Sequence, residues 1–232
     1  MPEIKVIKRI RMTHSGPVNE AGQLIHLQQG SLDGACGPYS LLMSLIICGA
    51  VSEHEKLVCL KPVRKNGATG KALLKMNELT SKEAGSLFRN GTDLCHLQDI
   101  AKSYRVNTEV EEARPIRASS NEYKTTGKSL DTKNVKDFVI KKVSDDHPVI
   151  LWLDCGDSAH WLVVVGLEYA SQKHKEMNKV SRFLLLDPDA PGPRVAAWNG
   201  AIEISSRREW HMWGSDHGEM PVTFRRALAV IT

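Results

Sequence analysis

The sequence contains no apolar run long enough to cross a bilayer as a helix, which takes about 20 residues. The longest such run, residues 41–51, is interrupted by Ser44 and predicts a buried helix instead. Residues 4–12 alternate Ile and Val with Lys and Arg, so they lack the apolar core of a signal peptide. We therefore expect no membrane partner and a cytoplasmic location. Export as an effector, by a route that needs no signal peptide, stays open.

Aromatic residues and an excess of charge of one sign are also scarce. Phe, Trp and Tyr make up 6% of the chain, and 31 Lys and Arg against 27 Asp and Glu give a net charge of +4. The basic residues are scattered along the chain, and no nucleic-acid-binding motif is present. This composition argues against a nucleic-acid partner and gives only a slight preference for acidic partners.

Sequence motifs for metals and cofactors are absent as well. None of the five cysteines forms Cys-x-x-Cys, no His lies at zinc-finger spacing from a cysteine pair, and there is no phosphate-binding glycine loop. We expect no metal and no cofactor. An odd number of cysteines without a secretion signal indicates free thiols in a reducing compartment. Four of them are explained as small buried apolar residues, namely Cys48, Cys59, Cys95 and Cys155.

Hydrophobic periodicity predicts helices first and strands later. The predicted helices cover 39–49, 71–78, 81–88, 92–104 and 131–143. The predicted strands cover 3–12, 105–111, 148–153, 161–167, 181–186, 201–205 and 221–230. Polar stretches predict loops over 113–127, 170–179 and 208–218. We expect a single α+β domain over residues 1–232, with a helical lobe at about 30–145 packed on an antiparallel sheet at about 146–232.

Cys36 is the cysteine that simple burial does not explain. It lies in the sequence Gly-Ala-Cys-Gly-Pro, at the start of the predicted buried helix. The first turn of a helix has unpaired backbone N–H groups and the positive end of the helix dipole, which favour a thiolate. Cys36 is therefore a candidate nucleophile, with a tight turn around a small buried residue as the alternative.

A histidine and an aspartate fall at strand ends, where they can serve such a nucleophile. His160 opens a strand and is followed by Trp-Leu-Val-Val-Val, and Asp187 ends the next apolar strand, before a proline. If the two strands are neighbours and antiparallel, Asp187 can reach the ring nitrogen of His160 that faces away from the thiol. Competing candidates for the Asp187 role are Asp154, Asp157 and Asp189.

The order of these motifs resembles that of the papain-like cysteine peptidases. The chain has a Gln, then Cys-Gly before an apolar helix, then His-Trp with an apolar strand, then Asp-Pro. Among such peptidases it is most similar to the family that cleaves double-glycine leaders from bacteriocins. The similar segments are residues 28–47 and 149–188. The resemblance implies a papain-like fold.

The same resemblance implies a role for each residue. Cys36 would be the nucleophile, His160 the base and Asp187 the residue that orients the base. It also implies an oxyanion-binding glutamine upstream of the cysteine. Gln29 is preferred to Gln28 because it is nearer, although both lie farther from the cysteine than the family's glutamine does.

These observations predict a thiol hydrolase that cleaves a peptide or isopeptide bond in a protein or peptide substrate. A free-standing peptidase, or a bacterial effector or toxin, fits better than a transporter-bound leader peptidase. A transglutaminase-like acyl transferase or deamidase is an alternative because it uses the same residues in the same order. A catalytically inert binding module of papain-like fold is a second alternative. The sequence defines neither the substrate nor the oligomeric state.

Overall fold

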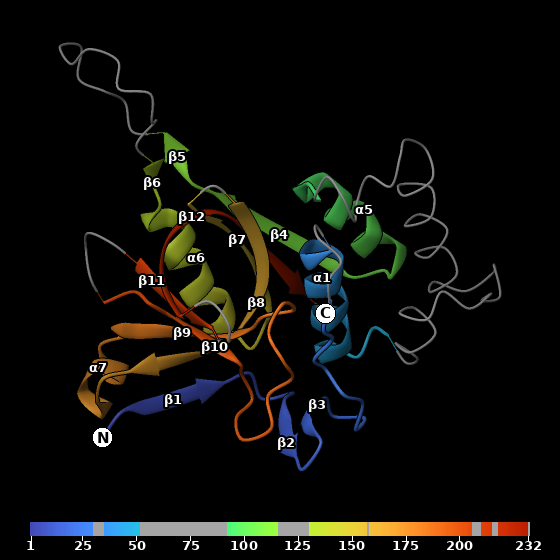
Figure 1. Ribbon diagram of the computed structural model, residues 1–232, viewed down its shortest axis with the longest axis horizontal. Coiled ribbons are helices and arrows are strands. Elements are labelled where there is room, and N and C mark those ends of the chain that lie inside the picture. Colours follow the sequence, from blue (N-terminus) through green and yellow to red (C-terminus); the bar gives the residue numbers. More distant parts are fainter. Residues whose placement is uncertain are drawn as a thin grey trace.

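The computed structural model describes residues 1–29, 35–51, 92–115, 130–156, 158–205, 210–214 and 218–231 (Figure 1). The helices predicted over 71–78 and 81–88, and most of the loop predicted over 113–127, lie outside these residues. So do Cys59 and Asp157.

Six antiparallel strands form a closed barrel at the centre of the described structure. In order around the barrel, they are β8 (Ser158–Tyr169), β7 (Val149–Cys155), β12 (Gly218–Ile231), β11 (Trp210–Gly214), β10 (Gly200–Glu203) and β9 (Val180–Leu186). The barrel closes because β8 pairs with β7 along one edge and with β9 along the other. Two further strands extend this sheet: β1 (Glu3–Val6) pairs with β8, and β4 (Asn107–Glu112) pairs with β12.

The expectation of a papain-like α+β fold, with a helical lobe at 30–145 and a sheet lobe at 146–232, is therefore wrong. One reason is β11, which lies in the loop predicted over 208–218 and pairs with both β10 and β12. Without this strand the predicted sheet stays open; with it the sheet closes. The second reason is that the helices do not form a lobe of their own. Helices α1 (Cys36–Ile47) and α6 (Lys133–Ser144) both pack directly on barrel strands.

Strand β8 is a continuous apolar run because both of its faces are covered. From Trp161 to Leu167, every residue of β8 is buried. The pairing of β8 with β9 skips Val165, since Val164 lies opposite Leu185 and Gly166 opposite Leu184. A Cβ on Gly166 would lie 2.7 Å from the backbone oxygen of Lys5. A glycine here allows β1 to approach β8 closely.

Helix α1 begins at Cys36, with Pro38 in its first turn, where a missing N–H costs nothing because helix N–H groups there have no partner. Its apolar residues from Leu41 to Ile47 are all buried. The helix ends at Ile47, and Gly49, just beyond the C-cap residue Cys48, has a φ of +69° that suits a left-handed C-terminal cap. Beside it lies α5 (Leu94–Ser103), which contacts both α1 and β4 (Figure 1).

The remaining elements are short. The predicted strand over 3–12 divides into β1 and β2 (Arg11–Thr13), and β2 forms a hairpin with β3 (Gly16–Val18). The pair β5 (Arg114–Pro115) and β6 (Leu130–Asp131) precedes α6. The polar stretch 170–179 contains a short helix, α7 (Gln172–Glu176), where a loop was predicted.

Candidate active site

The pairing of β8 with β9 brings His160 and Asp187 together. Leu186 at the end of β9 lies opposite Val163, so Asp187 continues the strand across from Leu162. His160 lies two residues before Leu162 and therefore on the same face of β8, diagonal to Asp187. His160 Nε2 donates a hydrogen bond of 2.7 Å to Asp187 Oδ1. The carboxylate is buried, since Asp187 is only 1% exposed.

The loop after β9 holds Asp187 through contacts that the sequence did not suggest. Asn199, just before β10, accepts a hydrogen bond of 2.7 Å from the Asp187 N–H and donates one of 2.9 Å to the Asp187 carbonyl. The ring of His26 donates to the same carbonyl at 3.0 Å. Burial lowers the pKa of His26, which keeps this ring neutral. Asp187 is thereby fixed from its backbone as well as through its side chain.

Cys36, at the first position of α1, completes the cluster. Cys36 is 6% exposed, and it lies close enough to His160 to raise the pKa of that ring. Because His160 Nε2 faces Asp187, Nδ1 is the ring nitrogen left for Cys36. Burial lowers the pKa of His160, but the hydrogen bonds and negative charges of Asp187 and Cys36 outweigh it and raise this pKa to about 10. Near neutral pH, His160 is therefore an imidazolium.

Close packing beside Cys36 keeps the start of α1 against β8. A Cβ on Gly37 would lie 2.9 Å from Thr92 Cβ and 3.2 Å from Trp161 Cδ1. The indole N–H of Trp161 also donates to the backbone oxygen of Thr92 at 2.9 Å. Gly37 is therefore needed for close approach, and Trp161, next to His160 in the chain, sets the distance between the two elements.

Of the two candidate glutamines, Gln29 lies beside the loop that carries Asp187. Its backbone N–H donates to the Pro188 carbonyl at 2.8 Å, and its Nε2 donates to Asp189 Oδ1 at 3.3 Å. Gln28 is exposed. Residues 30–34, between Gln29 and Cys36, lie outside the described part of the chain.

The competing aspartates have other contacts. Asp154 binds the guanidinium of Arg225. Asp189 donates its backbone N–H to Asp187 Oδ1 at 2.9 Å, while its side chain contacts Gln29. In the described structure, Asp187 is thus the aspartate that contacts the ring of His160.

A second thiol lies near this cluster. Cys155 ends β7 opposite Ser158, on the same face of the β7–β8 hairpin as His160. Burial raises the pKa of Cys155 to about 11, and the charges of Asp187, Asp154 and Cys36 add to this effect. Cys155 is therefore a protonated, weakly nucleophilic thiol at neutral pH.

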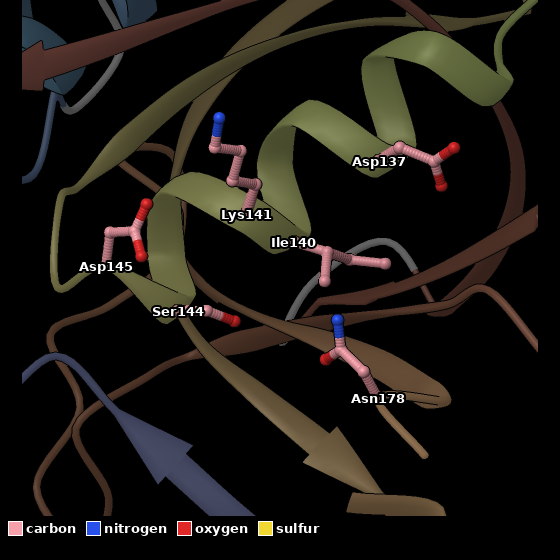
Figure 2. Close-up of a pocket in the computed structure, with 6 residues that line it drawn as sticks. All are labelled: Asp137, Ile140, Lys141, Ser144, Asp145 and Asn178. Carbon is pink, nitrogen blue, oxygen red and sulfur yellow. The ribbon is translucent and has the colours of Figure 1, made fainter.

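The described residues include no group of three or more His, Cys, Asp and Glu side chains that could hold a metal ion. Among their helices, none is both long and apolar enough to span a membrane. A pocket of about 330 Å³ lies between α6 and the segment after α7, with Asn178 facing the helix (Figure 2). Its residues do not include any member of the cluster around His160.

Comparison with known proteins adds no assignment: no protein-family model matches the chain, and no curated protein matches it.

Proposed function

We propose that the protein is a cysteine hydrolase that cleaves a peptide or isopeptide bond, with Cys36 as nucleophile, His160 as base and Asp187 as the residue that orients His160. The observation that carries this proposal is the cluster of Cys36, His160 and Asp187, in which His160 Nε2 lies 2.7 Å from Asp187 Oδ1 and Cys36 lies close enough to His160 to raise its pKa. A nucleophile within hydrogen-bond reach of a base, which a third group orients, is the general arrangement of covalent catalysis. The likeness to papain-like peptidases rests on the order of these residues and remains a prediction.

The geometry supports the following sequence of steps. The Cys36 thiolate attacks the substrate carbonyl, and the oxyanion takes hydrogen bonds from the Cys36 backbone N–H and from the Gln29 side chain. The imidazolium of His160 then gives its proton to the leaving amine. Water attacks the resulting thioester, with neutral His160 as base, and Cys36 returns as a thiolate.

The first test compares Cys36 with an exposed cysteine. Cys95 is exposed and Cys36 is buried, so iodoacetamide should alkylate Cys95 faster if exposure alone decides. We expect the reverse order near neutral pH, because only Cys36 has a protonated histidine as partner. Site-resolved mass spectrometry after brief labelling measures both rates, and Cys155, with a pKa of about 11, should be slow. Slower labelling of Cys36 than of Cys95 would remove its role as nucleophile.

The second test identifies the reaction, because hydrolysis and acyl transfer share the same thioester. A synthetic peptide mixture is incubated with the protein or with Cys36→Ala, and the masses of the products are compared. Peptide cleavage adds one water, whereas deamidation replaces ammonia with water, and cross-linking joins two chains with loss of ammonia. Cys36-dependent cleavage is the expected result. A Cys36-dependent loss of ammonia would replace the hydrolase with the deamidase or acyl transferase.

A further inference from the structure

The turn Asp187-Pro188-Asp189 contacts two different parts of the proposed site. Asp187 Oδ1 accepts from His160 Nε2 at 2.7 Å, and two residues later Asp189 Oδ1 accepts from Gln29 Nε2 at 3.3 Å. Between them, the Pro188 carbonyl accepts from the Gln29 backbone N–H at 2.8 Å. One short turn therefore contacts both the proposed base and the proposed oxyanion donor.

The side-chain amide of Gln29 is held in one of its two orientations. Its Nε2 faces the Asp189 carboxylate, while its Oε1 is buried with no hydrogen-bond partner among the described residues. A half-turn of the amide would exchange the two atoms and place a carbonyl oxygen against a carboxylate oxygen, so that two acceptors would meet. The Asp189 carboxylate therefore fixes the orientation of the Gln29 amide, even though Gln29 Oε1 is then buried without a partner among the described residues.

We propose that Asp189 is a positioning residue of the site: it fixes the Gln29 amide so that one N–H bonds to Asp189 and the second N–H is available to the oxyanion of the substrate. This inference rests on the proposed function, because it requires an oxyanion formed at Cys36. The Asp189 backbone N–H separately donates to Asp187 Oδ1 at 2.9 Å. Changing the Asp189 side chain therefore leaves that backbone contact, and with it the His160–Asp187 pair, in place.

Two reactions of the same thiol separate this role from a purely structural one. Acylation of Cys36 by p-nitrophenyl acetate passes through a tetrahedral oxyanion, whereas alkylation by iodoacetamide displaces iodide without forming one. We expect Asp189→Ala to slow acylation by about tenfold, less than the about 10²–10³ for loss of a whole oxyanion donor. Alkylation should change by less than about twofold, because the pKa of His160 is set by Asp187 and Cys36. Asp189→Asn keeps an acceptor oxygen and should restore most of the acylation rate.

A double-mutant cycle tests whether Asp189 acts through Gln29. Gln29→Ala should slow acylation more than Asp189→Ala does, and adding Asp189→Ala to Gln29→Ala should have no further effect. Additive losses, an unchanged acylation rate in Asp189→Ala, or equal slowing of both reactions would each overturn the positioning role alone. If wild-type Cys36 is alkylated no faster than Cys95 and is not acylated, the proposed function itself fails, and this inference fails with it.

Discussion

Two regions of the molecule gather polar side chains, and they differ in burial. The pocket beside α6 is lined by charged residues that are exposed, including Asp137, Lys141 and Asp145 (Figure 2). At the junction of α1 and the barrel, by contrast, Cys36 and Asp187 are buried and are bridged by His160. The pocket has an open volume of about 330 Å³, whereas the junction holds buried side chains that interact with one another.

This difference shows that a pocket in the surface need not be a reactive site. Charges that face water are screened, so the charged side chains of the α6 pocket interact only weakly with their neighbours. Charges inside a protein interact strongly, and the pKa of His160 rises from 6.5 to about 10. We therefore place the proposed chemistry at the junction, and the following predictions test the contrast.

The largest effect is expected from His160→Gln. This change removes the imidazolium partner of Cys36, so alkylation of Cys36 near neutral pH should fall by about 100-fold or more. The matched control is His211→Gln, because His211 is on β11 and bonds to Glu219 at 2.6 Å, outside the cluster. Rates come from site-resolved iodoacetamide labelling. If both variants slowed Cys36 equally, the special role of His160 would be lost.

A smaller effect with a defined pH dependence is expected from Asp187→Asn. In the wild type, a histidine pKa raised from 6.5 to about 10 stabilises the fold fully below pH 6.5. This contribution is lost as the pH rises through about 10. Asp187→Asn removes the carboxylate beside His160, so the folded-state pKa of His160 falls, its contribution to stability becomes smaller, and the loss is complete at a lower pH.

Urea unfolding between pH 6 and about 10 measures this change, and Cys36 alkylation in the same range should decline at lower pH in Asp187→Asn than in the wild type. We expect residual alkylation near neutral pH, because Asp187 acts through His160 and does not itself attack. Identical pH profiles for the two proteins would show that Asp187 does not set the charge of His160.

The proximity of His160 and Asp187 could be predicted, because both residues lie at the ends of continuous apolar runs. Such runs identify buried strands, and two strands that follow each other along the chain often pair. The closure of the barrel could not be predicted in this way. In β11, Trp210-His211-Met212-Trp213-Gly214 buries only Met212, so its pattern is that of a polar loop with aromatics. Only pairing with β10 and β12 makes it a strand.

The supporting contacts of the site were hidden for a similar reason. Asn199 precedes a glycine, and an Asn-Gly pair is typical of a turn. Nothing in the neighbouring sequence indicates that Asn199 binds the backbone of Asp187. The sequence suggests Asp189 only as a competitor of Asp187, because the spacing of two carboxylates along the chain does not define the direction in which each side chain points. In the structure they contact different residues.

A moderate loss of stability is expected from Gly37→Ala. The added methyl group would lie 2.9 Å from Thr92 Cβ, so α1 or Thr92 must move. We expect the free energy of unfolding to fall by about 1–3 kcal/mol, the usual range for overpacking, despite the higher helix propensity of alanine. Alkylation of Cys36 should slow as well, since the start of α1 moves relative to β8. Unchanged stability would mean that this contact is not tight.

The smallest effect is expected from Lys141→Ala, which tests the other half of the comparison. Lys141 is an exposed side chain of the α6 pocket, in the last turn of the helix (Figure 2). Removing its charge from that turn should cost only about 0.3–1 kcal/mol through the helix dipole. Cys36 alkylation and acylation should stay at wild-type rates, because the residues that line this pocket do not include Cys36, His160 or Asp187. A loss of acylation in Lys141→Ala with unchanged stability would couple the pocket to the reaction, and the contrast between an inert pocket and a reactive junction would then be wrong.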